Sequence, residues 1–271
     1  MTTDARAHQA RKRFGQNFLH DAVVIDRIVN AIDPQPGQTI FEIGPGQAAL
    51  TGRLIERTGH IHAVEIDRDL AAILRRRFDD TQLTLIEADV LKIDWHEVAS
   101  KPLRLVGNLP YNISTPLLFA LWPIADRVID QHFMLQREVV ERMVAPPGSK
   151  VYGRLSVMLQ FRYHMSKLFD VPPEAFKPAP KVTSSVVRMH PRPLQELPDV
   201  NANMFARVVA AAFGQRRKIL RNALADILNA DEIRDAGVDS QVRAETLSVQ
   251  SFVELARRAA AKTPTPECRL A

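Results

Sequence analysis

Short apolar runs alternate with segments of helical spacing through the first half of the chain. Residues 39–43, 61–64, 83–86 and 103–107 are rich in Ile, Leu and Val, and each has the length of a buried strand. Residues 50–55 place apolar side chains at helical spacing directly after the first run. Strands that alternate with helices predict an α/β fold with a mostly parallel sheet and helices on both faces.

The last third of the chain has a different pattern. Pro191, Pro193 and Pro198 interrupt it and indicate a linker. Further strands are predicted before the linker at residues 133–136 and 184–188. After the linker, apolar residues recur at helical spacing in residues 204–209, 218–224 and 251–255, with Ser248 or Ser251 available to cap the final helix. We therefore expect an α/β domain over residues 1–190, a proline-rich linker over 191–199 and a small all-α domain over 200–271.

Polar residues and glycines follow the predicted strands at their carboxyl ends. Gly44 and Gly46 follow the first strand, and glycines let a backbone pass close to a ligand. Glu65 ends the second strand, where an acidic residue binds ribose hydroxyls in such folds. Asp89 follows the third strand and suits an adenine amine, and Asn108 ends the fourth. Because parallel strands end at one edge, these residues predict a nucleotide-type cofactor site.

Two cofactors are compatible with the glycine loop. The spacing of Gly44, Gly46 and Ala49 fits a dinucleotide motif, so an NAD-binding dehydrogenase is one interpretation. However, Pro45 removes an N–H that a pyrophosphate would use. Glu42 would repel a diphosphate but suits the cationic end of S-adenosylmethionine. We therefore favour S-adenosylmethionine.

The tetrad Asn108-Leu109-Pro110-Tyr111 adds a chemical function to this edge of the sheet. It brings together a carboxamide, rigid backbone carbonyls and an aromatic ring. Hydrogen-bond acceptors can draw the N–H bonds of an exocyclic amine out of the plane of a base, which makes its nitrogen nucleophilic, while an aromatic ring holds the base by stacking. The tetrad has no role in hydride transfer. It indicates methyl transfer to a base, although Asn-x-Pro alone also favours turns.

With these features together, the chain resembles the KsgA/RsmA family of small-subunit ribosomal RNA adenine dimethyltransferases, from about Arg11 to the final helix. The matching motifs are Arg13-Phe14-Gly15-Gln16-Asn17-Phe18-Leu19, Glu42-Ile43-Gly44-Pro45-Gly46, the tetrad at 108–111, Gln136-Arg137-Glu138-Val139, Tyr152-Gly153-Arg154-Leu155-Ser156-Val157, Phe176-Lys177-Pro178-Ala179-Pro180-Lys181-Val182 and Phe213-Gly214-Gln215-Arg216-Arg217-Lys218. One residue departs from the pattern: Ala48 stands where the family usually has glycine, and its methyl group could shift the loop slightly.

The resemblance implies a class I, Rossmann-like S-adenosylmethionine-dependent methyltransferase sheet with an added helical domain. The residues expected to contact S-adenosylmethionine are Asn17, Leu19, Gly44, Gly46, Glu65, Asp89 and Asn108. Those expected to hold the target adenine are Asn108, Leu109, Pro110 and Tyr111, with Phe176 facing the base from the other side. The implied reaction is dimethylation of N6 on two adjacent adenosines in a hairpin loop near the 3′ end of 16S rRNA, within the small ribosomal subunit.

Clustered basic residues agree with an RNA partner. The formal net charge of the chain is +5, and the excess is concentrated near the N-terminus and at the start of the helical domain. The predicted RNA-binding residues are Arg11, Lys12, Arg13, Arg216, Arg217, Lys218 and Arg221. Such clusters suit phosphate contact, although charge runs also occur on ordinary solvated helix faces.

The composition narrows the remaining possibilities. Cys268 is the single cysteine, so no intrachain disulfide can form, and we expect a reducing, cytoplasmic location. No apolar stretch approaches the length of a membrane span. The spacing of the histidines suggests no metal site. We expect a monomer that requires no metal.

Two further alternatives share much of this evidence. An antibiotic-resistance methyltransferase acting on large-subunit rRNA would have the same fold, cofactor and tetrad. The segment 152–157 and the basic run at 215–218 argue against it. A non-catalytic ribosome-assembly factor is the other alternative, and assembly and catalysis can coexist in one protein.

Overall fold

A computed structural model describes residues 16–215 and 217–262 of the chain. The chain forms two compact units, each built from two stretches of sequence. The first contains the described residues up to Val140 together with His164–Pro191. The second contains Glu141–Tyr163 and the described residues from Arg192 onward.

The first unit is organised around a seven-stranded sheet with the order β4-β3-β2-β5-β6-β9-β7. The strands are β2 (Ile40–Ile43), β3 (Ile61–Glu65), β4 (Leu83–Glu87), β5 (Leu103–Asn108), β6 (Val128–Gln136), β7 (Tyr163–Val171) and β9 (Ser184–Pro191). Strands β2 to β6 pair in parallel, and β9 pairs antiparallel with β6. A separate two-stranded ladder joins β1 (Phe18–Leu19) to β8 (Phe176–Lys177).

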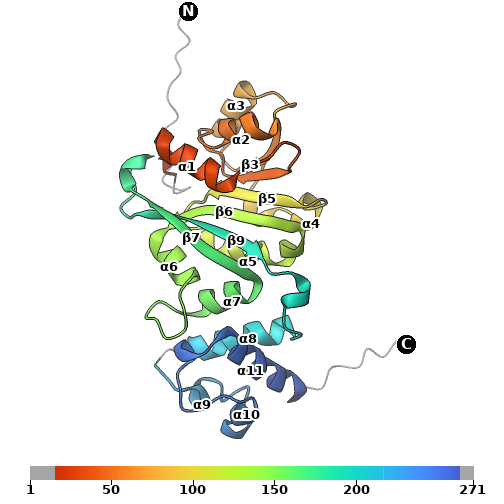
Figure 1. The fold of residues 1–271 in the computed structure, drawn as a ribbon, viewed down its shortest axis with the longest axis vertical. Coiled ribbons are helices and arrows are strands. Elements are labelled where there is room, and N and C mark those ends of the chain that lie inside the picture. Colours follow the sequence, from red (N-terminus) through yellow and green to blue (C-terminus); the bar gives the residue numbers. More distant parts are fainter. Residues whose placement is uncertain (1–15, 216, 263–271) are drawn as a thin grey trace, which may run out of the picture. The chain divides into compact units, whose positions relative to one another are not determined.

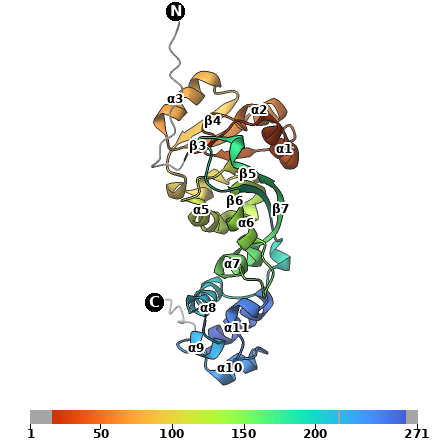
Figure 2. The same ribbon diagram turned by 90° about the vertical axis from the view of Figure 1, so that its left-hand side faces the viewer.

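Helices cover both faces of this sheet (Figure 1). They are α1 (Ala22–Ile32), α2 (Thr51–Thr58), α3 (Arg68–Arg77), α4 (Trp95–Val98) and α5 (Ser114–Ala120), and α6 (Arg137–Met143) follows β6. Alternate residues of β2 face opposite sides, as the pleat of a strand requires. Ile40 packs into the core formed with α1 and α2, which lie side by side (Figure 2). Phe41 contacts Trp95 of α4 edge to face, with ring centroids 5.4 Å apart.

Strand β5 passes very close to β2 just before its carboxyl end. A Cβ atom on Gly107 would lie 2.6 Å from the main-chain oxygen of Ile43. Only glycine fits at this position without a shift of one of the two strands. Gly107 therefore lets Asn108 emerge directly beside the loop that follows β2.

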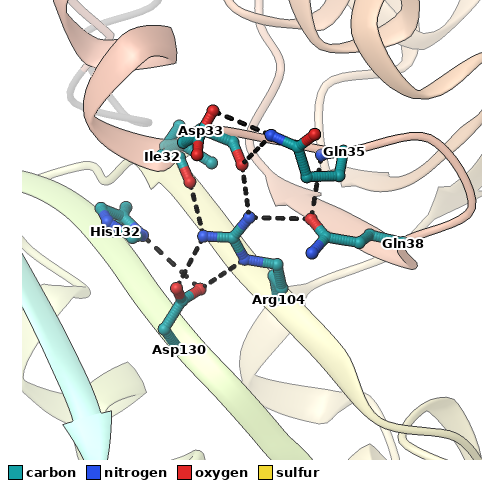
Figure 3. A network of polar contacts seen from close by, with 7 residues as sticks. All are labelled: Ile32, Asp33, Gln35, Gln38, Arg104, Asp130 and His132. Carbon is teal, nitrogen blue, oxygen red and sulfur yellow. Dashed lines mark hydrogen bonds and ion pairs between the residues drawn. The ribbon is translucent and has the colours of Figure 1, made fainter.

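A buried arginine anchors α1 at the opposite end of β5 (Figure 3). The guanidinium of Arg104 donates two hydrogen bonds to the carboxylate of Asp130, at 2.8 and 2.6 Å. It also donates to the main-chain oxygens of Ile32 and Asp33 at the end of α1, and to Oε1 of Gln38. Asp33 ends the helix in a left-handed conformation, with φ of 49°. The charge thus satisfies carbonyls that the helix itself leaves unpaired.

The second unit is helical. Its elements are α7 (Arg154–Arg162), α8 (Ala202–Gly214), α9 (Leu220–Ala223), α10 (Ala230–Asp235) and α11 (Val249–Lys262). Helix α8 lies beside α11 in both views and also packs on α7 (Figures 1 and 2). Aromatic pairs form its core: Phe161 with Phe205 at 4.4 Å between ring centroids, and Phe213 with Phe252 at 5.6 Å.

Several elements differ from the sequence-based expectations. Strand β7 has no counterpart among the predicted strands, and β6 begins five residues before the expected strand. Helix α9 is one turn long, and an isolated bridge from Ile219 to Arg243 lies directly before it. Ser248 caps α11, since its Oγ accepts a hydrogen bond from the amide of Ser251. Within the described ranges, none of the helices is long and apolar enough to cross a membrane.

The division into units also differs from the linear one. The chain passes between the two units three times, and the third passage, at Pro191/Arg192, falls next to the expected start of the linker. Residues 141–163 cluster with the C-terminal helices, whereas the sequence pattern assigns them to the α/β domain. The reason is the packing of α7 on α8, which is a contact between segments distant in sequence.

Candidate active site

A cavity of about 280 Å³ lies at the carboxyl edge of the sheet. It receives residues from the ends of β2, β3 and β5, from the segment after β4 and from the segment that includes β1. Ten of the residues predicted for the site line it: Asn17, Leu19, Gly44, Gly46, Glu65, Asp89, Asn108, Leu109, Pro110 and Tyr111. The structure therefore brings together side chains that are up to 94 positions apart in the sequence, from Asn17 to Tyr111.

The glycine loop is held by Glu65. Gly44 and Gly46 have φ angles of 68° and 57°, in the left-handed region where glycine is favoured. One carboxylate oxygen of Glu65 accepts a hydrogen bond from the amide of Gly46, at 3.0 Å, and the other accepts from the amide of Asp67, at 2.9 Å. Burial raises the pKa of Glu65. The carboxylate of Glu65 thus holds the glycine loop in place and also lines the cavity.

Ala48 lies in the same loop and has a φ of 66°. This is the position where the resembling family usually has glycine. A left-handed conformation costs an L-residue roughly 1–2 kcal/mol. The methyl group is buried in the core with Leu50 and Leu54, and this burial offsets part of that cost. The loop of this chain therefore keeps the glycine-like conformation despite the methyl group.

Glu42 is a second buried carboxyl group on the cavity wall, 2% exposed. Oγ1 of Thr51 donates a hydrogen bond to it at 2.7 Å. The pKa of Glu42 is raised from 4.5 to about 7: burial raises it most, the hydrogen bond from Thr51 offsets part of the rise, and the nearby charge of Glu65 adds to it. An anionic Glu42 in this place favours a ligand with positive charge.

Part of the cavity lining is apolar. Ile66 and Leu91 line it and are 45% and 38% exposed, which is unusual for large apolar side chains. Asp89 lies beside Leu91, and its carboxylate accepts a hydrogen bond from the amide of Leu91 at 3.0 Å. A flat ring with an amine at its edge would cover these apolar groups and could donate to Asp89.

Asn108 connects the cavity to the N-terminal segment. Its Nδ2 donates a hydrogen bond to the main-chain oxygen of Asn17, at 3.1 Å. The next residues, Phe18 and Leu19, pair with Lys177 and Phe176 in the β1–β8 ladder. The ring of Phe18 also lies against the glycine loop, because a Cβ on Gly46 would be 3.3 Å from it. Three predicted motifs thus meet at one place.

The structure places Phe176 differently from the other predicted residues. It does not line the cavity; its side chain is 3% exposed and packs in the core with Leu19. Its position beside prolines makes core packing less natural, yet the ladder between β1 and β8 holds the ring there. Its contact with the base stays a prediction.

The predicted RNA-binding residues are described only in part. Arg217, Lys218 and Arg221 are exposed at the start of the segment that follows α8. Arg11, Lys12, Arg13 and Arg216 lie outside the described residues. Their role in RNA binding stays a prediction.

Some residues at the site are absent from the sequence-based set. Gln16 and Ile66 line the cavity but were not predicted to do so. Ser114 and Ser184 hold Tyr111: Oγ of Ser114 donates to its main-chain oxygen at 3.0 Å, and Oγ of Ser184 lies 2.8 Å from its phenol oxygen. The sequence shows Ser184 only as a serine at the start of an apolar strand. Its partner, Tyr111, lies 73 residues away in the chain and is brought to it by the fold.

The strand order and the site together define the class of the protein. A parallel sheet with an antiparallel strand near one edge, a glycine loop after β2 and an acidic residue at the end of β3 are the features of a class I S-adenosylmethionine-dependent methyltransferase. Residues 7–261 match the family described as ribosomal RNA adenine dimethylase, and the chain belongs to this family. The NAD-binding alternative is therefore wrong.

Similar proteins agree with this assignment. The chain is 56% identical over 257 residues to the ribosomal RNA small subunit methyltransferase A of Aromatoleum aromaticum, covering 95% of this chain and 97% of that protein. It is 55% identical over 270 residues to the protein of the same name in Burkholderia cenocepacia, covering 96% and 98%.

Solved structures share the fold. A dimethyladenosine transferase from Plasmodium falciparum matches with a TM-score of 0.76 at 22% identity, covering 88% of this chain and 95% of that chain. The 23S rRNA methyltransferase ErmE matches with a TM-score of 0.70 at 24% identity, covering 90% and 100%. At these identities the likeness concerns the fold alone.

Proposed function

We propose that this protein transfers methyl groups from S-adenosylmethionine to N6 of two adjacent adenosines near the 3′ end of 16S rRNA, two to each base, in the assembling small ribosomal subunit. The observation that carries the proposal is the position of Asn108, which lines the cavity, begins the tetrad at 108–111 and donates a hydrogen bond to Asn17. The similarity to small-subunit methyltransferases at 54–56% identity supports the choice of RNA. We propose that the protein acts in the cytoplasm as a monomer.

The cavity fits S-adenosylmethionine in its chemistry. Glu65 offers a carboxylate to the ribose hydroxyls, Asp89 offers one to the adenine amine, and Ile66 and Leu91 offer apolar surface to the adenine ring. Glu42 is buried on the cavity wall, and a cationic group bound beside it would favour its ionised form and so pair with its carboxylate. When bound, S-adenosylmethionine supplies a methyl group on a positively charged sulfur.

The chain's own residues act chiefly by position and hydrogen bonding. With Nδ2 of Asn108 bonded to Asn17, its remaining polar atom is Oδ1, which can accept only. An acceptor at this place would take an N–H of the target amine and so free the nitrogen lone pair for in-line attack on the methyl carbon. As N6 bonds to the methyl carbon, the carbon–sulfur bond would break with its electron pair left on sulfur, which would leave as a neutral thioether. N6 would become positively charged and then release a proton to solvent. Tyr111 would hold the base by stacking.

Incubation of the protein with radiolabelled S-adenosylmethionine and undermethylated small subunits, followed by mapping of the modified bases, tests the proposal. We expect label only at the two adjacent adenosines, as dimethyladenosine. Parallel incubation with undermethylated large subunits tests the antibiotic-resistance alternative. Label in the large subunits, or no label in either, would contradict the proposal; tight subunit binding without label would instead favour a non-catalytic assembly factor.

A further inference from the structure

Tyr111 is fixed at both ends of the residue. Its main-chain oxygen accepts a hydrogen bond from Oγ of Ser114, at 3.0 Å. Its phenol oxygen lies 2.8 Å from Oγ of Ser184. Both serines are buried, at 2% and 1% exposed, whereas Tyr111 lines the cavity. Tyr111 therefore lines the cavity while buried hydroxyl groups hold its main chain and its phenol group.

Ser184 comes from a different part of the sheet than Tyr111. It is the first residue of β9, opposite Gln136 at the end of β6. Because β5 and β9 flank β6, the bond joins the turn after β5 to a strand two places away. Ser184 also follows directly on the segment 178–183, which continues from β8. The single hydrogen bond thus links the tetrad to the start of β9.

The neighbouring serine serves as an internal comparison. Oγ of Ser185 is 2.5 Å from a carboxylate oxygen of Asp170, which also pairs with Lys167. Adjacent residues of a strand face opposite sides of the sheet. Ser185 is therefore an equally buried hydroxyl on the same strand with a partner unrelated to Tyr111.

We propose that Ser184 is a positioning residue for methyl transfer: its hydroxyl holds the ring of Tyr111 in the orientation that stacks on the target adenine. The inference rests on the proposed function, in which Tyr111 holds the base. A ring that is ordered before the base arrives loses less conformational entropy on binding than one that must be ordered by it. Burial raises the pKa of Tyr111, and the bond to Ser184 lowers it in part. The phenol therefore stays protonated near neutral pH and acts through this bond.

The test compares Ser184→Ala with Ser185→Ala in the full-length protein. Single-turnover methylation of undermethylated small subunits gives the rate as a function of subunit concentration. For Ser184→Ala we expect the subunit concentration at half-maximal rate to rise about 3- to 10-fold, the range of one neutral hydrogen bond. The maximal rate should change less, and S-adenosylmethionine affinity should stay unchanged. Ser185→Ala should leave the methylation profile as in the unmodified protein, and equal effects of the two variants would overturn the inference.

A second arm separates positioning from a general loss of stability. Tyr111→Phe removes the same bond from the other side, so it should reproduce the effect of Ser184→Ala. The double variant should be no worse than either single one, and additive losses would overturn the proposal even if Ser184→Ala folds poorly. The carbon-13 signal of the Tyr111 phenol carbon, assigned by its absence in Tyr111→Phe, should shift in Ser184→Ala and not in Ser185→Ala.

The signal is read without RNA or cofactor, so it does not depend on the proposed function. An unshifted signal would mean that Ser184 does not bond to Tyr111. If the signal shifts but Tyr111→Ala methylates subunits normally, the stacking role of Tyr111 fails instead.

Discussion

Nδ2 of Asn108 donates a hydrogen bond to the main-chain oxygen of Asn17, 3.1 Å away. A carbonyl oxygen can only accept, so this contact fixes which end of the carboxamide faces Asn17. It also joins the carboxyl end of β5 to the segment that enters the β1–β8 ladder. The acceptor atom of the proposed reaction is therefore oriented by a segment 91 residues earlier in the chain.

Replacing Asn108 by alanine should slow methyl transfer far more than it weakens RNA binding. The acceptor acts mainly as the amine becomes tetrahedral, and loss of one preorganised group typically costs ~10²–10³ in rate. Single-turnover methylation and subunit affinity, measured side by side, check this. The control is Asn222→Ala, at an exposed position in α9. If Asn108→Ala methylates at the wild-type rate, the proposed role of Asn108 as acceptor is wrong, even though the chain belongs to the family.

Glu65→Ala should weaken S-adenosylmethionine binding by about 2–4 kcal/mol, because two hydrogen bonds from ribose to a carboxylate are lost. The structure adds a second cause, since Glu65 also accepts from the amide of Gly46 and orders the glycine loop. Isothermal titration calorimetry measures the affinity. Glu87→Ala is a matched control, because Glu87 pairs with Glu65 in register on β4 but does not line the cavity. Unchanged affinity in a folded Glu65→Ala protein would remove Glu65 from the site.

Glu42 should make the stability of the ligand-free protein depend on pH. Burial raises its pKa from 4.5 to about 7, so the folded state keeps a proton that the unfolded chain releases between these values. Stability should fall as pH rises through this window. Glu42→Gln stays neutral and can still accept from Thr51. The variant should therefore be more stable than the unmodified protein at about pH 8, by up to about 3 kcal/mol.

Urea unfolding at about pH 8 and about pH 5 measures this difference, which should shrink to under about 1 kcal/mol at the lower pH. Glu56→Gln, on the exposed side of α2, is the control. If Glu42→Gln gains the same stability at both values, the carboxyl group is not the cause.

Arg104→Met should destabilise the first unit by about 3–5 kcal/mol, because it leaves the buried Asp130 without its partner. Burial alone would raise the pKa of Asp130, but the nearby side chains of His132 and Arg104 outweigh it and hold the pKa at about 2. The ion pair contributes fully to the free energy of unfolding above about pH 4, where Asp130 is ionised in both the folded and the unfolded chain. This contribution is lost as the pH falls through about 2 and Asp130 gains a proton in the folded state. The deficit of Arg104→Met should therefore shrink in acid.

Urea unfolding over this acid range checks the prediction. Arg104→Met/Asp130→Leu, which removes both charges, should recover much of the stability near neutral pH. A double variant as unstable as the single one would show that an unpaired charge is not the main cost.

The exposed cations after α8 should contribute to RNA affinity through phosphate contact. Replacing Arg217, Lys218 and Arg221 together by alanine should weaken subunit binding. It should also make the fall of log affinity with log salt less steep, by about 2–3 in the slope, since each phosphate contact releases counterions. Binding measured over a series of salt concentrations checks this. A charge-matched control replaces Arg68, Arg76 and Lys101, exposed in the first unit. If both triple variants give the same slope of log affinity against log salt, then Arg217, Lys218 and Arg221 belong to an ordinary solvated surface.

The parallel strands, the glycine loop and the family are all readable from the amino-acid sequence. Apolar runs mark strands locally, and the residues at their ends are held at one edge by the parallel pairing of those strands. That is why the sequence pattern is sufficient to assign Gly44, Glu65, Asp89 and Asn108 to one cavity. The spacing of apolar residues and the residues at strand ends can be read from short stretches of sequence. They indicate a site clearly here because each of these strands is followed by a functional residue.

The pairing of groups across the sheet, by contrast, is set by the tertiary structure. The bonds of Asn108 to Asn17 and of Tyr111 to Ser184 join residues 91 and 73 positions apart. The assignment of residues 141–163 to the helical unit likewise depends on packing between distant segments. Phe176 is a core residue because β8 pairs with β1, a two-residue ladder with no periodic pattern to reveal it. Such contacts depend on where the whole chain places each side chain, and no local stretch of sequence contains that information.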